Sequence, residues 1–115
     1  MTVDSYTVID DADLARSPSI RELVGKEHGV SVCVILVDMA PGEGVRLHRH
    51  TYPEIFVVQE GSATFRVGDE SLEVHAPRTL IVATGVSHAF TNTGMERLRQ
   101  VDIHLSPEFV TEWLE

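Results

Sequence analysis

The sequence predicts an all-β fold, a barrel or a sandwich, and three observations support that prediction. Short runs rich in valine, isoleucine and other apolar residues recur at short, regular intervals along the chain. Turn residues end these runs, as at Pro41 and Gly42, which suit the two central positions of a type II turn. No stretch between the runs is long enough and helical enough for a β-α-β unit. The chain of 115 residues suits one domain with a core of modest size.

About eight strands are expected from these runs. In "GVRLHRH" (44–50), side chains on alternate positions share a face, so His48 and His50 project together. The expected strands cover residues 30–39, 44–50, 54–60, 63–68, 71–75, 78–84, 88–92 and 97–105. They form the core barrel, about residues 30–105, of a single domain that covers residues 1–115.

A short helix is expected at each end of the barrel. "SIREL" (19–23) begins with Ser19 and has Glu22 three residues later, which is the spacing of a capping box. "SPEFVTEWLE" (106–115) begins with a serine N-cap, followed by a proline in the first turn, where the missing N–H does little harm. Its two aromatic residues are four positions apart and would share one helix face.

Charge and composition disfavour several classes of partner. Eighteen acidic side chains against nine basic ones give a net charge of −9, which disfavours nucleic acid and anionic membrane surfaces as partners. The longest apolar run, residues 32–37, is too short to span a membrane. No signal peptide is visible, so a cytoplasmic location is expected. The single cysteine, Cys33, lies in that apolar run and is expected to be a small buried hydrophobe.

The stretch "RLHRHTYPEIF" (46–56) is a candidate metal site. His48 and His50 would point the same way from a strand, and neutral imidazole is a good ligand for transition metals. Pro53 predicts a bend that turns Glu54 back toward both histidines. A His-x-His pair alone would occur in roughly one shuffled sequence in four, so the pair by itself is also compatible with a polar strand edge. The nearby glutamate and the flanking glycines favour the metal site.

These residues resemble the cupin superfamily. The first cupin motif is matched at every defined position, by Gly42, His48, His50, Glu54 and Gly61. In the second motif, "ATGVSHAFTN", the matching residues are Gly85, His88 and Asn92. Ala83 and Pro77 stand where the family usually has a proline and a glycine, and both departures fall in turns. The two motifs span residues 42–92, and the flanking strands suit a small, single-domain cupin.

The resemblance implies a cupin-type double-stranded β-helix, or jelly-roll, barrel with one metal ion inside. His48, His50, Glu54 and His88 would bind that ion and leave coordination positions open, as a catalytic metal needs. Nitrogen and oxygen donors without a thiolate suit a divalent Mn, Fe, Co, Ni, Cu or Zn ion and do not choose among them. Asn92 is expected to be a structural hydrogen-bonding residue rather than a ligand.

Two functions from different classes remain open. The resemblance implies a metal-dependent enzyme on a small molecule, of the dioxygenase, decarboxylase or isomerase type, in which Glu54 leaves the metal and acts as a catalytic base. The alternative is a non-catalytic metal- or small-molecule-binding protein used for sensing or storage. A cavity with extra polar groups beside the donors would favour the enzyme. The family also implies a homodimer with exchanged N-terminal strands, for which "DSYTVID" (4–10) is a candidate.

Strand parity suggests which side chains surround the site. The candidate substrate-binding residues are Tyr52, Phe56, Phe90, Gln100 and His104. Phe56 and Phe90 share parity with ligands, although simple core packing is the more common role for such residues. In the last strand, Gln100, Asp102 and His104 lie on one face, but parity does not say whether that face or the opposite apolar face points inward.

Overall fold

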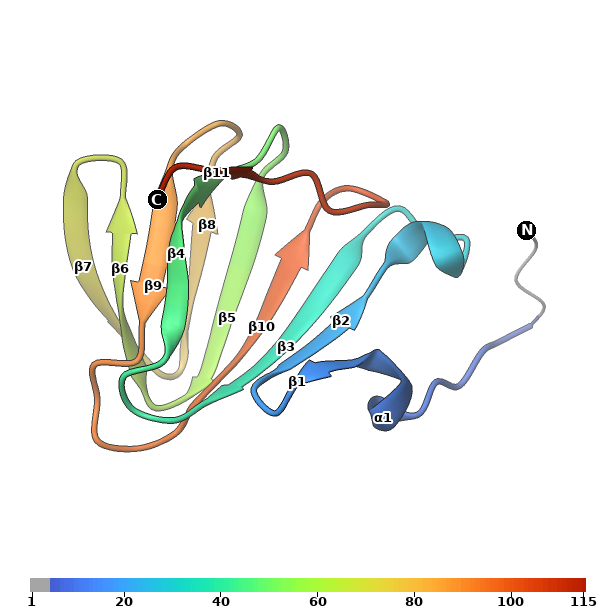
Figure 1. Cartoon of the computed structure of the whole chain (residues 1–115), viewed down its shortest axis with the longest axis horizontal. Helices are drawn as coiled ribbons and strands as arrows, with labels where there is room; N and C mark the ends of the chain where they lie inside the picture. The colour runs from blue at the N-terminus through green and yellow to red at the C-terminus, as the bar shows by residue number, and fades with distance from the viewer. Residues whose placement is uncertain (1–4) are drawn as a thin grey trace.

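A computed structural model describes residues 5–115 as two antiparallel sheets that face each other (Figure 1). One sheet has the order β1-β2-β3-β10-β5-β8 and the other β11-β4-β9-β6-β7. The strands are β1 (Ala15–Ser17), β2 (Ile20–Leu23), β3 (Cys33–Met39), β4 (Gly44–Arg49), β5 (Glu54–Glu60), β6 (Ser62–Val67), β7 (Glu70–His75), β8 (Arg78–Val82), β9 (His88–Thr91), β10 (Leu98–His104) and β11 (Glu112–Trp113). The helical elements are α1 (Asp11–Leu14) and the 3₁₀ turn Gly25–Glu27.

All eight expected strands are present, with ends that move by a few residues. The all-β jelly-roll prediction is therefore confirmed. No helix in residues 5–115 is long and apolar enough to cross a membrane.

The two short helices are not found where the sequence placed them. Residues 19–23 contain β2, which pairs with β3 from Ile20 opposite Val37 to Leu23 opposite Val34. Residues 106–115 begin with bends at 106–108 and contain β11, which pairs with β4. Both segments are too short to be stable as isolated helices, so the hydrogen bonds of an available sheet edge decide their conformation. The one α-helix of the described chain is the single turn α1.

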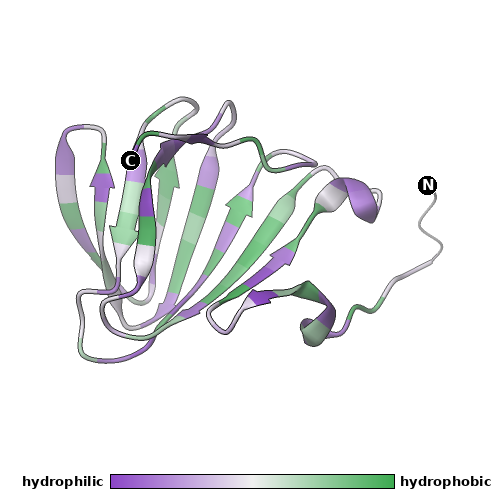
Figure 2. Ribbon diagram, viewed as in Figure 1, coloured by the Kyte–Doolittle hydropathy of each residue, from purple (hydrophilic) through white to green (hydrophobic). Residues whose placement is uncertain are grey.

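The core lies between the two sheets, where inward side chains alternate with outward ones. Figure 2 shows the alternation as bands of opposite hydropathy along the strands. The buried rings of Phe56, Phe65 and Phe90 pack together, with centroids 5.1 Å apart for the first two and 5.4 Å for the last two. Cys33 is buried, as expected, and accepts a hydrogen bond from the backbone N–H of Gly25. This packing holds the site on rigid strands.

Asn92 connects a turn to the barrel, as its sequence position suggested. Its Nδ2 donates to the carbonyl oxygens of Met39, at 3.1 Å, and Glu96, at 2.9 Å. Its Oδ1 accepts the backbone N–H of Gly94 at 3.1 Å. The side chain is only 1 % exposed, so these bonds satisfy a buried amide without any contact to the histidine cluster.

Gly61, in the tight connection from β5 to β6, is expected to be the glycine of the two motifs that tolerates an added side chain least. Its φ is +77°, and an added Cβ would lie 2.4 Å from the carbonyl oxygen of Arg97. Gly85 has a similar φ of +78°, but an added Cβ there would meet nothing within 4 Å. Gly85→Ala therefore measures the cost of the left-handed backbone, about 1–2 kcal/mol, and Gly61→Ala should cost clearly more. Urea denaturation of both variants checks this, and equal losses would contradict it.

Candidate metal centre

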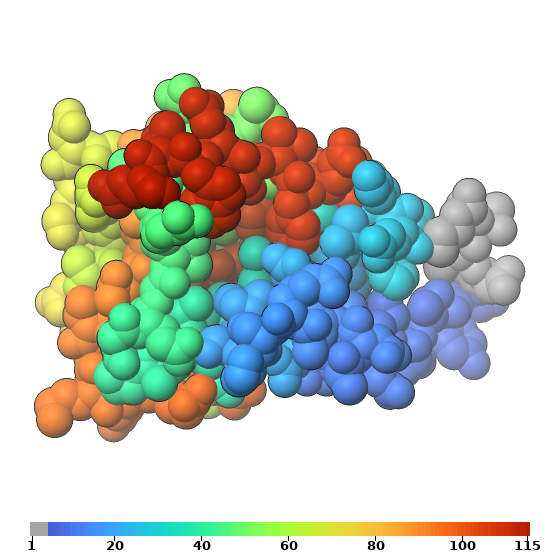
Figure 3. All heavy atoms as spheres, in the orientation of Figure 1, coloured from blue at the N-terminus to red at the C-terminus, as the bar shows by residue number. Residues whose placement is uncertain are grey.

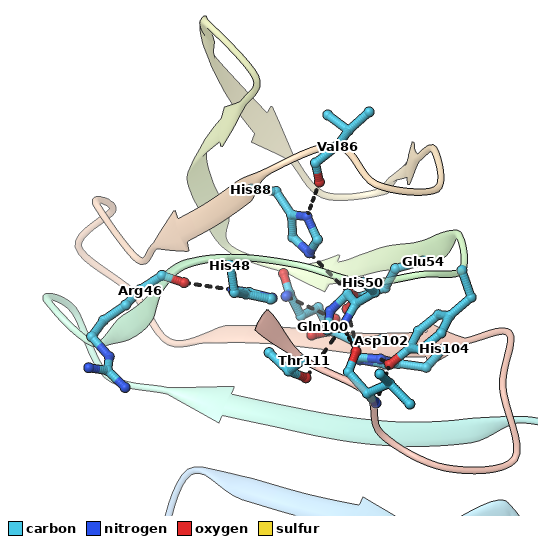
Figure 4. Close-up of polar contacts among 12 residues, drawn as sticks. Arg46, His48, His50, Glu54, Val86, His88, Gln100, Asp102, His104 and Thr111 are labelled. Atoms are coloured by element: carbon cyan, nitrogen blue, oxygen red, sulfur yellow. Dashed lines mark hydrogen bonds and ion pairs between the residues drawn. The ribbon is translucent and has the colours of Figure 1, made fainter. Parts of the chain in front are cut away.

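Four donor residues meet between the two sheets, at one end of the barrel (Figure 4). His48 lies near the end of β4 and His50 just beyond it, Glu54 opens β5, and His88 opens β9. The donor atoms of these residues, called the four-donor cluster below, all lie within 4.8 Å of one another, and all four side chains are buried. Residues 51–53 form the expected bend that returns Glu54 to the two histidines. The cluster could hold a metal ion.

Backbone carbonyl groups orient all three histidines of the cluster. Nδ1 of His48 lies 2.6 Å from the carbonyl oxygen of Arg46, that of His50 lies 2.9 Å from Val110, and that of His88 lies 2.9 Å from Val86. A carbonyl oxygen only accepts, so each Nδ1 carries the proton and each Nε2 keeps its lone pair. This arrangement is typical of histidines that bind metals through Nε2.

The bare nitrogens converge on one carboxylate. Nε2 of His50 lies 3.0 Å from Oε1 of Glu54, and Nε2 of His88 lies 3.2 Å from the same oxygen. Nε2 of His50 is buried and has no aligned hydrogen-bond partner in residues 5–115. Two acceptors at this separation repel each other unless a cation lies between them. The donor set therefore fits a divalent ion held by three imidazoles and one carboxylate.

The pKa shifts of His48 and Glu54 favour the protonation states in which these residues bind a metal. Burial lowers the pKa of His48 to about 4, against the opposing hydrogen bond to Arg46, and the neighbouring His88 and His50 contribute to this shift. Burial alone would raise the pKa of Glu54, but its contact with His104 opposes burial, and the pKa stays below the ordinary value. At neutral pH the cluster thus offers a neutral imidazole at His48 and a carboxylate at Glu54, as metal binding requires.

A cavity of about 350 Å³ opens beside the four-donor cluster. The cluster residues His48, His50 and Glu54 form part of its wall. Its apolar lining residues are Ile20, Ile35, Val45, Phe56, Phe90, Phe109 and Trp113. Its further polar lining residues are Glu22, Asp102, His104 and Thr111. No lysine or arginine lines it, within the residues that the structure describes.

Not all five candidate substrate-binding residues reach this cavity. Phe56, Phe90 and His104 line it. Tyr52 lies behind the wall, where its hydroxyl oxygen is 2.7 Å from Nδ1 of His104 and its ring stacks on His50 at 4.8 Å. Gln100 also lies behind the wall and donates from Nε2 to Oδ1 of Asp102 at 2.9 Å.

Strand β10 turns its polar face inward. Leu98, Gln100, Asp102 and His104 are all buried, whereas the residues between them are exposed or half-buried. Sequence parity left both faces possible, and pairing of β10 with both β3 and β5 decides between them. Asp102 is therefore a cavity residue that the candidate set omitted. Burial raises the pKa of the Asp102 carboxyl well above its ordinary value of 3.8, and the nearby charge of Glu54 adds to the shift.

Because Asp102 is buried, we expect Asp102→Asn to raise the free energy of unfolding of the metal-free protein by an amount that depends on pH. A raised pKa means that the folded chain binds more protons than the unfolded one. The contribution of Asp102 to the free energy of unfolding therefore falls as pH rises above 3.8. The stability advantage of Asp102→Asn over wild type should thus grow between pH 4 and pH 7, because asparagine does not titrate and keeps an oxygen for Gln100. Urea midpoints at both pH values measure it. Asp69→Asn, in the exposed turn between β6 and β7, is the control. A pH-independent difference for Asp102→Asn would contradict the prediction.

The C-terminal segment, residues 106–115, closes one side of the cavity. Figure 3 shows it (red) lying across the molecule against β4. Phe109, Thr111 and Trp113 line the cavity, and the carbonyl oxygen of Val110 is the acceptor that orients His50. The sequence did not predict that this segment lines the cavity and orients His50, because the segment was expected to be a helix. Its alternating odd-numbered residues, Phe109, Thr111 and Trp113, are the strand-like signal that could have revealed it.

Comparison with protein families identifies the fold and the site region together. The family model Cupin_2, described as the cupin domain, matches residues 35–104, which contain the whole four-donor cluster. This chain is a cupin. The family assignment from the two motifs is thereby confirmed, and it covers well over half of the chain.

A curated relative of this cupin is "Polyketide synthase CurC" from Streptomyces cyaneus. The two sequences are 38 % identical over 73 residues, which is 63 % of this cupin and 47 % of the relative. This cupin therefore aligns with about half the length of that relative.

Solved structures share the fold at low sequence identity. A double-stranded β-helix domain protein from Klebsiella pneumoniae has a TM-score of 0.76 at 16 % identity, over 96 % of this cupin and 99 % of that chain. An oxalate decarboxylase from Lactobacillus farciminis has a TM-score of 0.76 at 19 % identity, over 90 % of this cupin and 34 % of that chain. An oxalate oxidase has a TM-score of 0.72 at 23 % identity, over 86 % of this cupin and 57 % of that chain.

Proposed function

We propose that this cupin is a metal-dependent enzyme that acts on a small molecule at a mononuclear centre of three histidines and one glutamate. The observation that carries the proposal is the convergence of three oriented Nε2 atoms and the Glu54 carboxylate beside a cavity. His48, His50, Glu54 and His88 would bind one divalent Mn, Fe, Co, Ni, Cu or Zn ion. The ion would act as a Lewis acid toward an oxygen of the substrate.

The surrounding residues would handle the substrate and its protons. Glu54 is the candidate catalytic base, because its carboxylate is kept ionised in a buried site next to the cavity. Phe56 and Phe90 would pack against the substrate and exclude water, and His104 would contact it directly. Tyr52 and Gln100 would act from behind the wall, through His104 and Asp102 respectively.

The cavity lining argues for a particular kind of substrate. Oxalate is a small dianion, and this cavity offers it no lysine or arginine in the described chain. Apolar and aromatic walls instead favour a larger, weakly charged molecule with metal-binding oxygens, such as an enediol or a β-dicarbonyl compound. The similarity to a protein named as a polyketide synthase is compatible with this class. Dioxygenase, decarboxylase and isomerase chemistry are all open to such substrates.

The alternative function is a non-catalytic sensor or storage protein. The mostly apolar cavity wall and the covering C-terminal segment favour tight retention of a ligand. Four polar residues beyond the donors, Glu22, Asp102, His104 and Thr111, favour the enzyme. The cytoplasmic location expected from the sequence stays a prediction.

The function is tested with protein purified without a histidine tag and loaded in turn with each candidate metal. Acetylacetone, catechol and oxalate are the substrates, and oxygen uptake, carbon dioxide release and mass spectra of the products are followed. We expect turnover of acetylacetone or catechol, and its loss in Glu54→Gln at a metal content measured in parallel. Ligand binding without turnover under any metal would instead support the sensor or storage protein.

We also propose that the protein forms a homodimer through the outer face of the β3-β10-β5-β8 sheet. Ile81, 67 % exposed, and Leu36, 38 % exposed, lie on this face. Half-buried residues on the same face are Ile55, Val57, Val101 and Ile103. A second copy is the natural occupant, because it also brings an extended N-terminal arm with exposed Tyr6 and Val8.

Light scattering after gel filtration tests the dimer. Ile81→Glu places a charge in the apolar face and should give a monomer, whereas wild type should give a dimer. Met95→Glu is the matched control, since Met95 is 96 % exposed on a loop outside this face. A monomeric wild type at micromolar concentration would contradict the proposal.

A further inference from the structure

A fourth buried histidine, His104 on β10, lies beside the four-donor cluster but is not part of it. It is 3 % exposed and lines the cavity. Its Nε2 lies 3.1 Å from Oε2 of Glu54, but the contact is not aligned as a hydrogen bond. Within residues 5–115, this buried nitrogen therefore has no hydrogen-bond partner, on a residue that lines the cavity.

The partner of Nδ1 distinguishes His104 from the three cluster histidines. Each cluster histidine has a backbone carbonyl oxygen at Nδ1, and such an oxygen can only accept a hydrogen bond. Nδ1 of His104 instead faces the hydroxyl of Tyr52 at 2.7 Å, and a hydroxyl can donate. The two kinds of partner allow opposite tautomers at neighbouring rings.

The other contact of Tyr52 settles which way its hydroxyl points. The hydroxyl oxygen accepts the backbone N–H of Val110 at 3.4 Å. In the described part of the chain, its proton has no acceptor other than Nδ1 of His104. Tyr52 therefore donates to Nδ1, and neutral His104 carries its proton on Nε2. A ring nitrogen with a proton cannot bind a metal, which explains why a fourth histidine lies next to the cluster without joining it.

We propose that His104 is a hydrogen-bond donor, through Nε2–H, to an oxygen of the molecule bound in the cavity, and that Tyr52 is the positioning residue that fixes this tautomer. The tautomer rests on contacts within the chain. The donation to a bound molecule rests on the proposed function.

This donor narrows the class of ligand. A molecule with two neighbouring oxygens could place one toward the four-donor cluster and the other within reach of Nε2 of His104. A buried donor left without an acceptor is unfavourable, so a ligand that lacks the second oxygen should bind about tenfold or more weakly. Enediols, catechols and β-dicarbonyl compounds have this pair of oxygens.

The tautomer is tested first, in the metal-free protein, by long-range proton–nitrogen correlation spectra of ¹⁵N-labelled chain. We expect the proton on Nε2 of His104 and on Nδ1 of His48, His50 and His88. In Tyr52→Phe, which keeps the ring but removes the donor, His104 should lose its preference while the three cluster histidines keep theirs. A proton on Nδ1 of His104 in wild type would overturn the proposal. This test needs neither metal nor turnover, so it decides the tautomer of His104 even if the proposed function is wrong.

The donor role is tested with cobalt-loaded protein, whose visible spectrum reports binding of catechol. His104→Ala should weaken catechol binding about tenfold, with cobalt affinity within about twofold of wild type, and His104→Gln, which retains an N–H donor, should restore part of the loss. Unchanged catechol affinity, or none in wild type, would overturn the donor role. A large loss of cobalt affinity in His104→Ala would make His104 a ligand and overturn it as well. Catechol binding without turnover would leave this proposal standing while the enzyme proposal fails.

Discussion

The double substitution His48→Ala and His88→Ala is expected to reduce bound metal from about one ion per chain to nearly none, because a divalent ion on one imidazole and one carboxylate is weakly held. The two residues lie on adjacent strands of one sheet, β4 and β9, where they are paired directly, so the substitution removes both donors that these strands supply. Metal content by mass spectrometry, on protein purified without a histidine tag, measures the effect.

His75→Ala is the matched control for this experiment. His75 ends β7, and its exposed side chain lies 3.7 Å from Glu73 and does not belong to the four-donor cluster. Its replacement should leave metal content unchanged, whereas alanine at His48 and His88 should remove the metal. Equal, near-zero metal in wild type and in the double variant would contradict the metal centre itself.

Deletion of residues 108–115 is expected to lower metal affinity about 10- to 100-fold, although no cluster residue is removed. The deletion takes away the carbonyl oxygen of Val110, which orients His50 at 2.9 Å, and opens the cavity beside Phe109 and Trp113. Competition with a chromophoric chelator measures the affinity, and circular dichroism checks that the β fold is retained.

Glu112→Gln is the control for the deletion, because it removes a surface charge of the segment and leaves the carbonyl oxygen of Val110 that orients His50. Glu112 pairs with Arg49 at 2.8 Å on the surface, and exposed ion pairs of this kind contribute little. This variant should bind metal as wild type does. Unchanged affinity in the deletion variant, with its fold intact, would show that Val110 does not support the site.

Much of the candidate site was readable from the sequence because it is local. His48, His50 and Glu54 lie within seven consecutive residues, and strand alternation plus one proline bend is enough to bring them together. His88 needed the second motif, since no local rule relates it to the first. Buried polar residues of β10 could be grouped by parity, but not assigned to a face, because alternation is symmetric between the two sides of a sheet.

The helix predictions were wrong at both ends for one physical reason. A serine N-cap or a capping box lowers the free energy of a short helix by a small amount. Ladder hydrogen bonds with β3 and β4 outweigh that amount once the barrel exists. Phe109 and Trp113 were expected to share a helix face, but they line the cavity from an extended segment instead.

The sequence by itself determined the strand pattern, the family and the four donors, because each depends on residue types at short spacings. Only the tertiary structure decided which face of β10 points inward, that residues 106–115 close the cavity, and that Tyr52 contacts His104. These features depend on which edges and faces remain available after the two sheets pack together. No spacing along the chain encodes them, since their contacts join residues about 50 or more positions apart, such as Tyr52 with His104 and His50 with Val110.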